Sequence, residues 1–159
     1  MVVPVPGQPV TARLFGKLPA HGDFVTRGCT AAERAGLDAW LTASLTDAQS
    51  RFGGEFADRF DAARPWKGRG AGAVGVIAAS QDAAGRRYPL VLLCAEADDI
   101  EDLIYAAIAE RWDADRLATV AGIGPSSSIE RWESADGGMC LDGGMPVDIV
   151  TAMLETVGV

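Results

Sequence analysis

The sequence is poor in the residues from which metal and redox sites are built. It contains one histidine, His21, and three cysteines, Cys29, Cys94 and Cys140, which lie far apart and form no Cys-x-x-Cys pair. A metal site based on histidine would need carboxylates to complete its ligands, so we expect no metal. The odd number of cysteines favours free thiols in a reducing compartment over a disulfide framework, and we expect a cytoplasmic location.

Long apolar runs and an excess of basic residues are also missing. No stretch approaches the ~18 consecutive apolar residues of a membrane-spanning helix, so we expect no membrane insertion. Lys and Arg number 14 against 22 Asp and Glu, which gives a net charge of −8. Such a surface repels phosphate backbones and anionic lipids, and we expect no nucleic-acid partner. The first ten residues contain three prolines and no basic region, which predicts a flexible arm and not a secretory signal.

What is present is the composition of one ordinary globular domain. The chain has 159 residues, of which 48% are hydrophobic and 23% are charged. A domain of this size buries roughly 70% of the surface that its unfolded chain exposes, so it can hold a core without disulfides or metals. No linker, repeat or low-complexity stretch divides the sequence. We predict a single domain over residues 11–159, preceded by the arm at 1–10.

Helical periodicity identifies the longest predicted element. Thr30 followed by Glu33 forms a capping box, and apolar residues then recur at helical spacing. The helix is expected to end at Gly53, before a short second helix over 55–63. Further helices are predicted at residues 99–112, 113–122 and 146–157.

Short apolar runs predict the strands. Residues 90–94 are apolar without alternation, which indicates a strand that is buried on both faces of a sheet. The linker from the preceding strand at 74–80 is too short for a parallel crossover, so the two are expected to pair antiparallel near the middle of the sheet. The fold class is α/β (α+β mixed), with a single central mixed, largely antiparallel sheet and helices packed on its faces. The predicted strands are 11–18, 74–80, 89–95, 126–133 and 139–141, with loops at 19–28 and 64–72.

Two polar loops, 16–28 and 80–89, interrupt the apolar pattern. His21 could act as a general base or ligand with Asp23 orienting it, or the loop could be purely structural, with Asp23 bonded to backbone N–H groups or to an arginine. Ser80 lacks the Gly-x-Ser-x-Gly context of a nucleophile elbow. We predict that the loops lie side by side, with Asp23 or Asp82 bonded to Arg86 or Arg87. The candidate residues are Lys17, His21, Asp23, Arg27, Ser80, Asp82 and Arg86.

Neither a phosphate-binding loop nor a dinucleotide fingerprint is complete. Leu18 follows Gly16-Lys17 where the phosphate motif requires Ser or Thr, and the glycines at 68, 70 and 72 have the wrong spacing. We therefore expect no cofactor. Trp66 follows a proline in the glycine-rich loop 64–72, where it could be half exposed and anchor a protein partner, or it could pack over an adjacent strand.

Residues 15–28 and 80–90 together resemble the signature of a known family. The run Phe-Gly-Lys-Leu-Pro-Ala-His-Gly-Asp-Phe-Val with Arg27-Gly28 is similar to the opening motif of the TagF (ImpM) family of type VI secretion-associated proteins. The second stretch matches the pattern Ser-x-Asp-x-x-Gly-Arg-x-aromatic-Pro-Leu. Pro65-Trp66 fits the region between them, and the resemblance covers nearly the whole chain after residue 10.

The resemblance implies a cytoplasmic accessory protein of a Gram-negative bacterium. It implies a post-translational regulator, a repressor, that binds type VI secretion components such as the forkhead-associated scaffold protein, and that is not an enzyme. The alternative is an enzyme or small-ligand-binding domain that uses the polar loops 16–28 and 80–89. An enzyme would bring titratable groups together in a partly apolar pocket. A binding module would pair its loop charges beside an exposed apolar patch. No oligomeric state is indicated.

Overall fold

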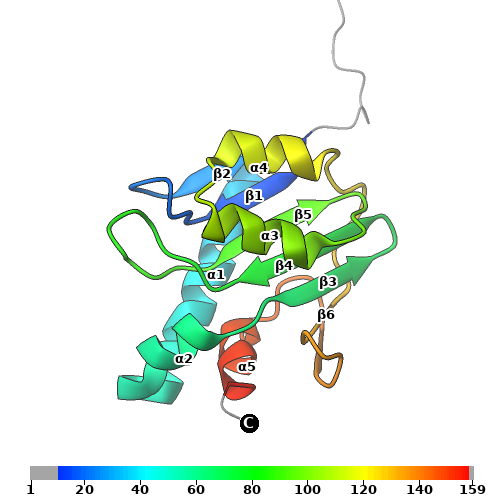
Figure 1. Ribbon diagram of the computed structural model, residues 1–159. Coiled ribbons are helices and arrows are strands. Elements are labelled where there is room, and N and C mark those ends of the chain that lie inside the picture. Colours follow the sequence, from blue (N-terminus) through cyan, green and yellow to red (C-terminus); the bar gives the residue numbers. More distant parts are fainter. Residues whose placement is uncertain (1–10, 158–159) are drawn as a thin grey trace, which may run out of the picture.

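The strands of the computed structural model, which describes residues 11–157, form one seven-stranded sheet (Figure 1). Their bounds are β1 Arg13–Gly16, β2 Val25–Arg27, β3 Trp66–Gly70, β4 Ala73–Ala78, β5 Leu90–Cys94, β6 Arg131–Glu133 and β7 Cys140–Asp142. The order across the sheet is β2-β1-β5-β4-β3-β6-β7, and every neighbouring pair is antiparallel. From the sequence we predicted a mixed, largely antiparallel sheet, and the observed sheet has antiparallel pairs throughout. The arm predicted at 1–10 lies outside the described residues.

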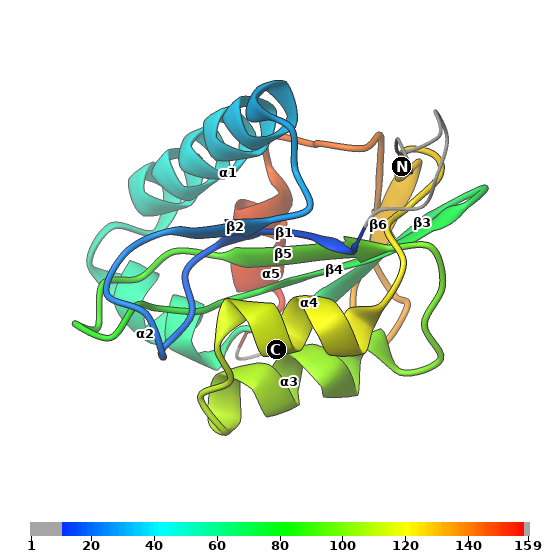
Figure 2. The same cartoon turned by 90° about the horizontal axis from the view of Figure 1, so that it is seen from above.

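Helices cover both faces of this sheet (Figure 2). They are α1 Ala31–Phe52, α2 Phe56–Ala62, α3 Ile100–Ala109, α4 Ala114–Ala121 and α5 Ile149–Glu155. Helices α1, α2 and α5 share one buried apolar cluster with the sheet, and α3 and α4 share the other. None of the described helices combines the length and the apolar character needed to cross a bilayer.

The central strands explain why residues 90–94 are apolar without alternation. β5 lies between β1 and β4. Val91 faces the cluster beneath α1, whereas Leu90 and Leu92 face the cluster beneath α3. Each face of β5 is therefore covered, and the predicted antiparallel pairing with β4 near the middle of the sheet is confirmed.

The predicted capping box at the start of α1 is formed. The Glu33 amide donates to the Thr30 hydroxyl at 3.1 Å, and the Thr30 amide donates to Glu33 Oε1 at 2.8 Å. The helix ends as expected at Gly53, whose positive φ of 53° suits glycine. The last helix differs from the prediction, because Pro146 lies before its first turn and α5 begins at Ile149.

Two segments predicted as loops contain strands. Residues 25–27 form β2 on the outer side of β1, and residues 66–70 form β3 between β4 and β6. The glycines of β3 had suggested a turn, but they serve packing instead. A Cβ on Gly68 would lie 3.0 Å from Cε3 of Trp132 on the neighbouring strand. The indole therefore requires a bare backbone at this point of the sheet.

Candidate functional site

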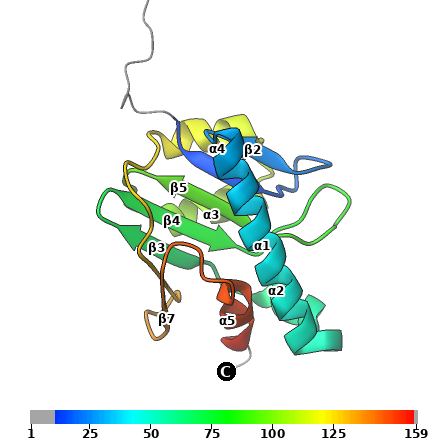
Figure 3. The same cartoon turned by 180° about the vertical axis from the view of Figure 1, so that it is seen from behind.

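The two polar loops, 16–28 and 80–89, which we call the motif loops, meet at one end of the sheet. Gly16 at the end of β1 pairs with Leu90 at the start of β5, so each loop leaves the sheet beside the other. Figure 3 shows both loops projecting from the same side of the molecule. The prediction that they lie side by side is confirmed.

Asp82 is the centre of the contact between the motif loops. Its buried carboxylate accepts hydrogen bonds from Arg86 Nε at 2.7 Å and from the backbone amides of Ala84 and Arg86 at 2.9 and 3.0 Å. Lys17 Nζ, from the other loop, lies 3.2 Å from Oδ2. Burial opposes ionisation, but these donors outweigh it and lower the pKa of Asp82 to about 2. The predicted bond between Asp82 and Arg86 is present.

Further hydrogen bonds join the loops through backbone carbonyls. The Ser80 hydroxyl donates to the carbonyl of Lys17 at 2.7 Å, and Arg86 Nη2 donates to the carbonyl of Gly22 at 2.7 Å. The amide of Ala83 donates to the carbonyl of His21 at 2.7 Å. The polar groups of Ser80, Asp82 and Arg86 are thus engaged in holding one loop against the other. We call this set of contacts the loop lock.

The single histidine caps a helix. His21 Nε2 accepts a hydrogen bond from the backbone amide of Ala114, the first residue of α4, at 3.0 Å. Asp23 accepts from the amide of Phe24 at 2.7 Å, and within residues 11–157 no hydrogen bond joins it to His21 or to an arginine. An imidazole oriented by Asp23 is therefore not formed.

Arg27 connects β2 to α4. Its Nε lies 2.6 Å from Asp115 Oδ1, and this hydrogen bond lowers the pKa of Asp115. Both side chains are substantially exposed, so the pair contributes little to stability.

Trp66 is not the exposed anchor that its loop-like surroundings suggested. It is 1% exposed, because it begins β3 and its side chain enters the core beneath α1, α2 and α5. An aromatic residue of the first motif loop is exposed instead. Phe24 is 46% exposed, and its ring stacks on Phe15 at 5.8 Å and meets Tyr88 edge-on at 4.8 Å. Lys17 Nζ lies 4.8 Å from the centre of the Phe24 ring.

Both motif loops lie within the range of a family match. The sequence matches the family described as TagF N-terminal domain, Type VI secretion system-associated, over residues 13–135. The chain belongs to the TagF family. It is thus a type VI secretion-associated protein, as the resemblance of its motif loops indicated.

A solved structure shares the TagF fold of this chain. The crystal structure of PA0076 from Pseudomonas aeruginosa PAO1 superimposes with a TM-score of 0.61 at 20% sequence identity. The alignment covers 91% of this chain and 77% of that one, and at this identity the likeness concerns the fold. No curated protein matches the chain.

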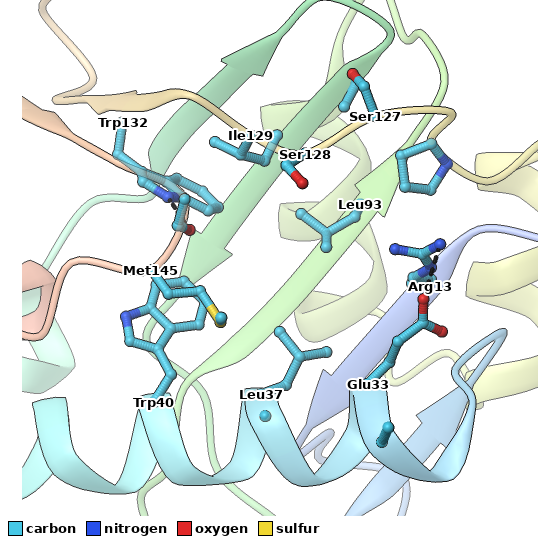
Figure 4. A pocket seen from close by; sticks show the side chains of 15 residues that line it. Arg13, Glu33, Leu37, Trp40, Leu93, Ser127, Ser128, Ile129, Trp132 and Met145 are labelled. Carbon is cyan, nitrogen blue, oxygen red and sulfur yellow. Dashed lines mark hydrogen bonds and ion pairs between the residues drawn. The ribbon is translucent and has the colours of Figure 1, made fainter.

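The TagF domain has a second notable feature at the other end of β1, which sequence reasoning missed (Figure 4). A pocket of about 370 Å³ opens between the first half of α1 and the residues around Ile129 and Met145. The rings of Trp40 and Trp132, which both line it, lie 5.8 Å apart. We call it the α1 pocket. Within the described chain, no three His, Cys, Asp or Glu side chains gather closely enough to hold a metal ion.

The segment that closes the α1 pocket is fixed by both tryptophans. The Trp40 indole N–H donates to the carbonyl of Pro146 at 2.8 Å, and that of Trp132 donates to the carbonyl of Gly144 at 2.9 Å. Met145 lies between these two anchors and is 56% exposed. The pocket is therefore lined by two anchored tryptophans and by the long, adaptable side chain of Met145.

Proposed function

We propose that this TagF domain represses type VI secretion by binding a protein of the secretion machine in the bacterial cytoplasm. The supporting observation is the loop lock beside the exposed ring of Phe24. The charges of Lys17, Asp82 and Arg86 satisfy one another, and the Phe24 ring, whose centre lies 4.8 Å from Lys17 Nζ, is half exposed. An exposed aromatic ring beside charges that are already paired is a candidate anchor for a protein partner.

The same geometry supports binding over catalysis. A catalytic base needs a free lone pair near a site where a substrate can lie, whereas the Nε2 of His21 accepts the Ala114 amide. A nucleophilic Ser80 would need a base beside it, whereas its hydroxyl donates to the carbonyl of Lys17. The residues of the enzyme hypothesis have structural partners, so we propose a domain with no turnover of its own.

The forkhead-associated scaffold protein, which the family resemblance implies, is the first partner to test. The experiment compares Phe24→Ala with Tyr105→Ala. Tyr105 is a matched control, because it is 44% exposed, against 46% for Phe24, but lies on α3 over the opposite face of the sheet. Affinity is measured by calorimetry with the purified scaffold protein, and regulation by secretion of a type VI substrate in cells.

We expect Phe24→Ala to weaken binding and relieve repression while Tyr105→Ala does neither. Truncating a central aromatic contact costs about 2 kcal/mol or more, which corresponds to roughly a 30-fold weaker dissociation constant. Each variant is checked by thermal melting, because Phe24 also contacts Phe15 and Tyr88. Unchanged binding and secretion in a folded Phe24→Ala variant would reject the motif loops as the contact surface.

A further inference from the structure

The side chain of His21 joins the first motif loop to the start of α4. Its Nε2 accepts a hydrogen bond from the backbone amide of Ala114 at 3.0 Å, and Ala114 is the first residue of the helix and is fully buried. A ring nitrogen that accepts a hydrogen bond carries no proton of its own. The contact therefore requires the neutral imidazole, with its proton on Nδ1.

A protonated imidazole cannot keep this contact. Both ring nitrogens of the imidazolium are donors, so the amide of Ala114 would face an N–H group in place of a lone pair. The contact also lies at the first turn of α4, which is the positive end of the helix dipole and disfavours a cation. One proton on His21 thus removes the acceptor of a buried amide and places like charges beside each other.

The charged side chains on the elements around His21 do not replace the lost acceptor. Asp115 is the acid that the histidine charge reaches, since its pKa is lowered chiefly by Arg27 and also by His21. It is exposed and paired with Arg27 at 2.6 Å, so it favours the proton only weakly and accepts nothing from Ala114. The other charged groups already have partners, and they are Asp113 and Arg116 at α4, Arg111 after α3, Asp23 in the same loop, and Asp82 and Arg86 in the second motif loop.

The rest of the chain has little else that changes charge near neutral pH. His21 is the only histidine, and histidine is the side chain that ordinarily titrates between about pH 5 and 8. Burial raises the pKa of Cys29 and that of Cys94, the latter to about 11, so both thiols stay neutral in this interval. The pKa of Asp82 is about 2, so the loop lock stays ionised there.

We infer that the link between His21 and Ala114 is a proton-sensitive switch, in which the neutral imidazole holds the first motif loop on α4 and protonation releases it. The contacts of the loop lock do not use the imidazole, so the two motif loops stay together. Phe24 follows His21 by three residues and is half exposed, so the release changes how its ring is held. The effect on a partner rests on the proposed function, whereas the release is a property of the chain alone.

The test is an NMR titration of the isotope-labelled full chain between about pH 7.5 and 5.5. The amide signal of Ala114 should move with the same midpoint as the ring signals of His21. Its protection from hydrogen exchange, corrected for the intrinsic dependence of exchange on pH, should fall about two- to tenfold, as expected for the loss of one hydrogen bond.

Two variants are the matched controls. His21→Gln offers an uncharged oxygen at every pH, so the protection of Ala114 should stay constant over the same interval. His21→Ala has no acceptor at any pH, so the protection should be low and constant, and this variant serves if the glutamine side chain does not reach the amide. A ring that stays neutral throughout, an Ala114 amide that does not change as the ring titrates, or the same fall in protection in both variants would overturn the switch.

A second arm measures affinity for the purified forkhead-associated scaffold protein at the two ends of the interval. The unaltered chain should bind about two- to tenfold more weakly at the lower pH, after correction for the change seen with His21→Gln. An equal change in both chains would overturn the effect on the partner. The NMR titration decides the switch even where the scaffold protein does not bind, so failure of the proposed function and failure of the switch are told apart.

Discussion

Replacing His21 by alanine separates a structural role of the sole histidine from a chemical one. The first amide groups of a helix have no acceptors within the helix. In α4, His21 Nε2 accepts from Ala114 at 3.0 Å, and Asp113 Oδ1 accepts from the amide of Arg116 at 2.8 Å. The imidazole thus completes the cap of a helix whose first residue, Ala114, is fully buried.

The magnitude follows from these contacts. Losing a helix cap costs about 0.5–2 kcal/mol, and leaving a buried amide without an acceptor costs about 1–3 kcal/mol. His21 is only partly buried, so water can replace part of the lost bond, and we expect about 1–2 kcal/mol for His21→Ala. For a domain of this size that lowers the melting temperature by about 2–8 °C. The backbone bonds of His21 to Leu18 and Ala83 remain.

The assay is thermal and urea unfolding of His21→Ala and His21→Gln beside the unaltered chain. A glutamine side chain can place an oxygen near the position of Nε2, so it should recover part of the lost stability. Secretion through a type VI system is measured with the same variants. A melting temperature of His21→Ala within about 1 °C of the unaltered chain would refute the capping argument. A folded His21→Ala variant that binds its partner but does not regulate would favour chemistry at His21.

Three further predictions concern the core and the loop lock. The hydroxyl of Ser44 on α1 accepts from the amide of Val150 in the first turn of α5 at 2.9 Å, so Ser44→Ala should cost about 1–3 kcal/mol in urea unfolding. The exposed Ser50→Ala on the same helix should change stability by about 0.5 kcal/mol or less. Because the pKa of Asp82 is lowered from 3.8 to about 2, its carboxylate stabilises the fold above about pH 4. That contribution is lost as the pH falls from 4 to 2, and the urea midpoint of Asp82→Asn should change less over this interval. Trp66→Ala should cost about 3–5 kcal/mol, and any loss of partner binding should track the unfolded fraction measured by circular dichroism.

Local chemistry made part of this fold predictable. The capping box of α1 needs only Thr30 and Glu33, which lie three residues apart. The burial of β5 was predicted from its apolar composition. β3 could not be predicted in the same way, because it contains Gly68 and Gly70, and glycine is typical of turns. The need for glycine at these positions comes from residues far away in the sequence. A Cβ on Gly70 would lie 2.0 Å from the carbonyl oxygen of Ser128, and that approach exists only in the folded chain.

The candidate site likewise has features that local sequence predicts and features that depend on distant residues. The bond between Asp82 and Arg86 joins residues four apart, and it is one of the four pairings of Asp23 or Asp82 with Arg86 or Arg87 that the sequence left open. The α1 pocket brings Trp40 together with Trp132 and Met145, which lie about a hundred residues along the chain from it, and the only local sign was a glycine inside a helical pattern. Phe24 could have been found as the aromatic residue of a polar loop, but the sequence alone does not separate an exposed ring from a buried one.

The loop lock determines which variants can inform on function. Lys17, Ser80, Asp82 and Arg86 hold one motif loop against the other, so replacing any of them disturbs the shape of the surface as well as its chemistry. A secretion defect in Arg86→Ala would therefore not locate a partner. Phe24 takes no part in these hydrogen bonds and is half exposed, so we expect its truncation to change the surface while the hydrogen bonds between the loops remain. A secretion defect in Phe24→Ala at an unchanged melting temperature is the result that would assign the motif loops to partner binding. The same defect in variants of Lys17, Ser80, Asp82 or Arg86 would not strengthen that assignment, because those variants also disturb the shape of the loops.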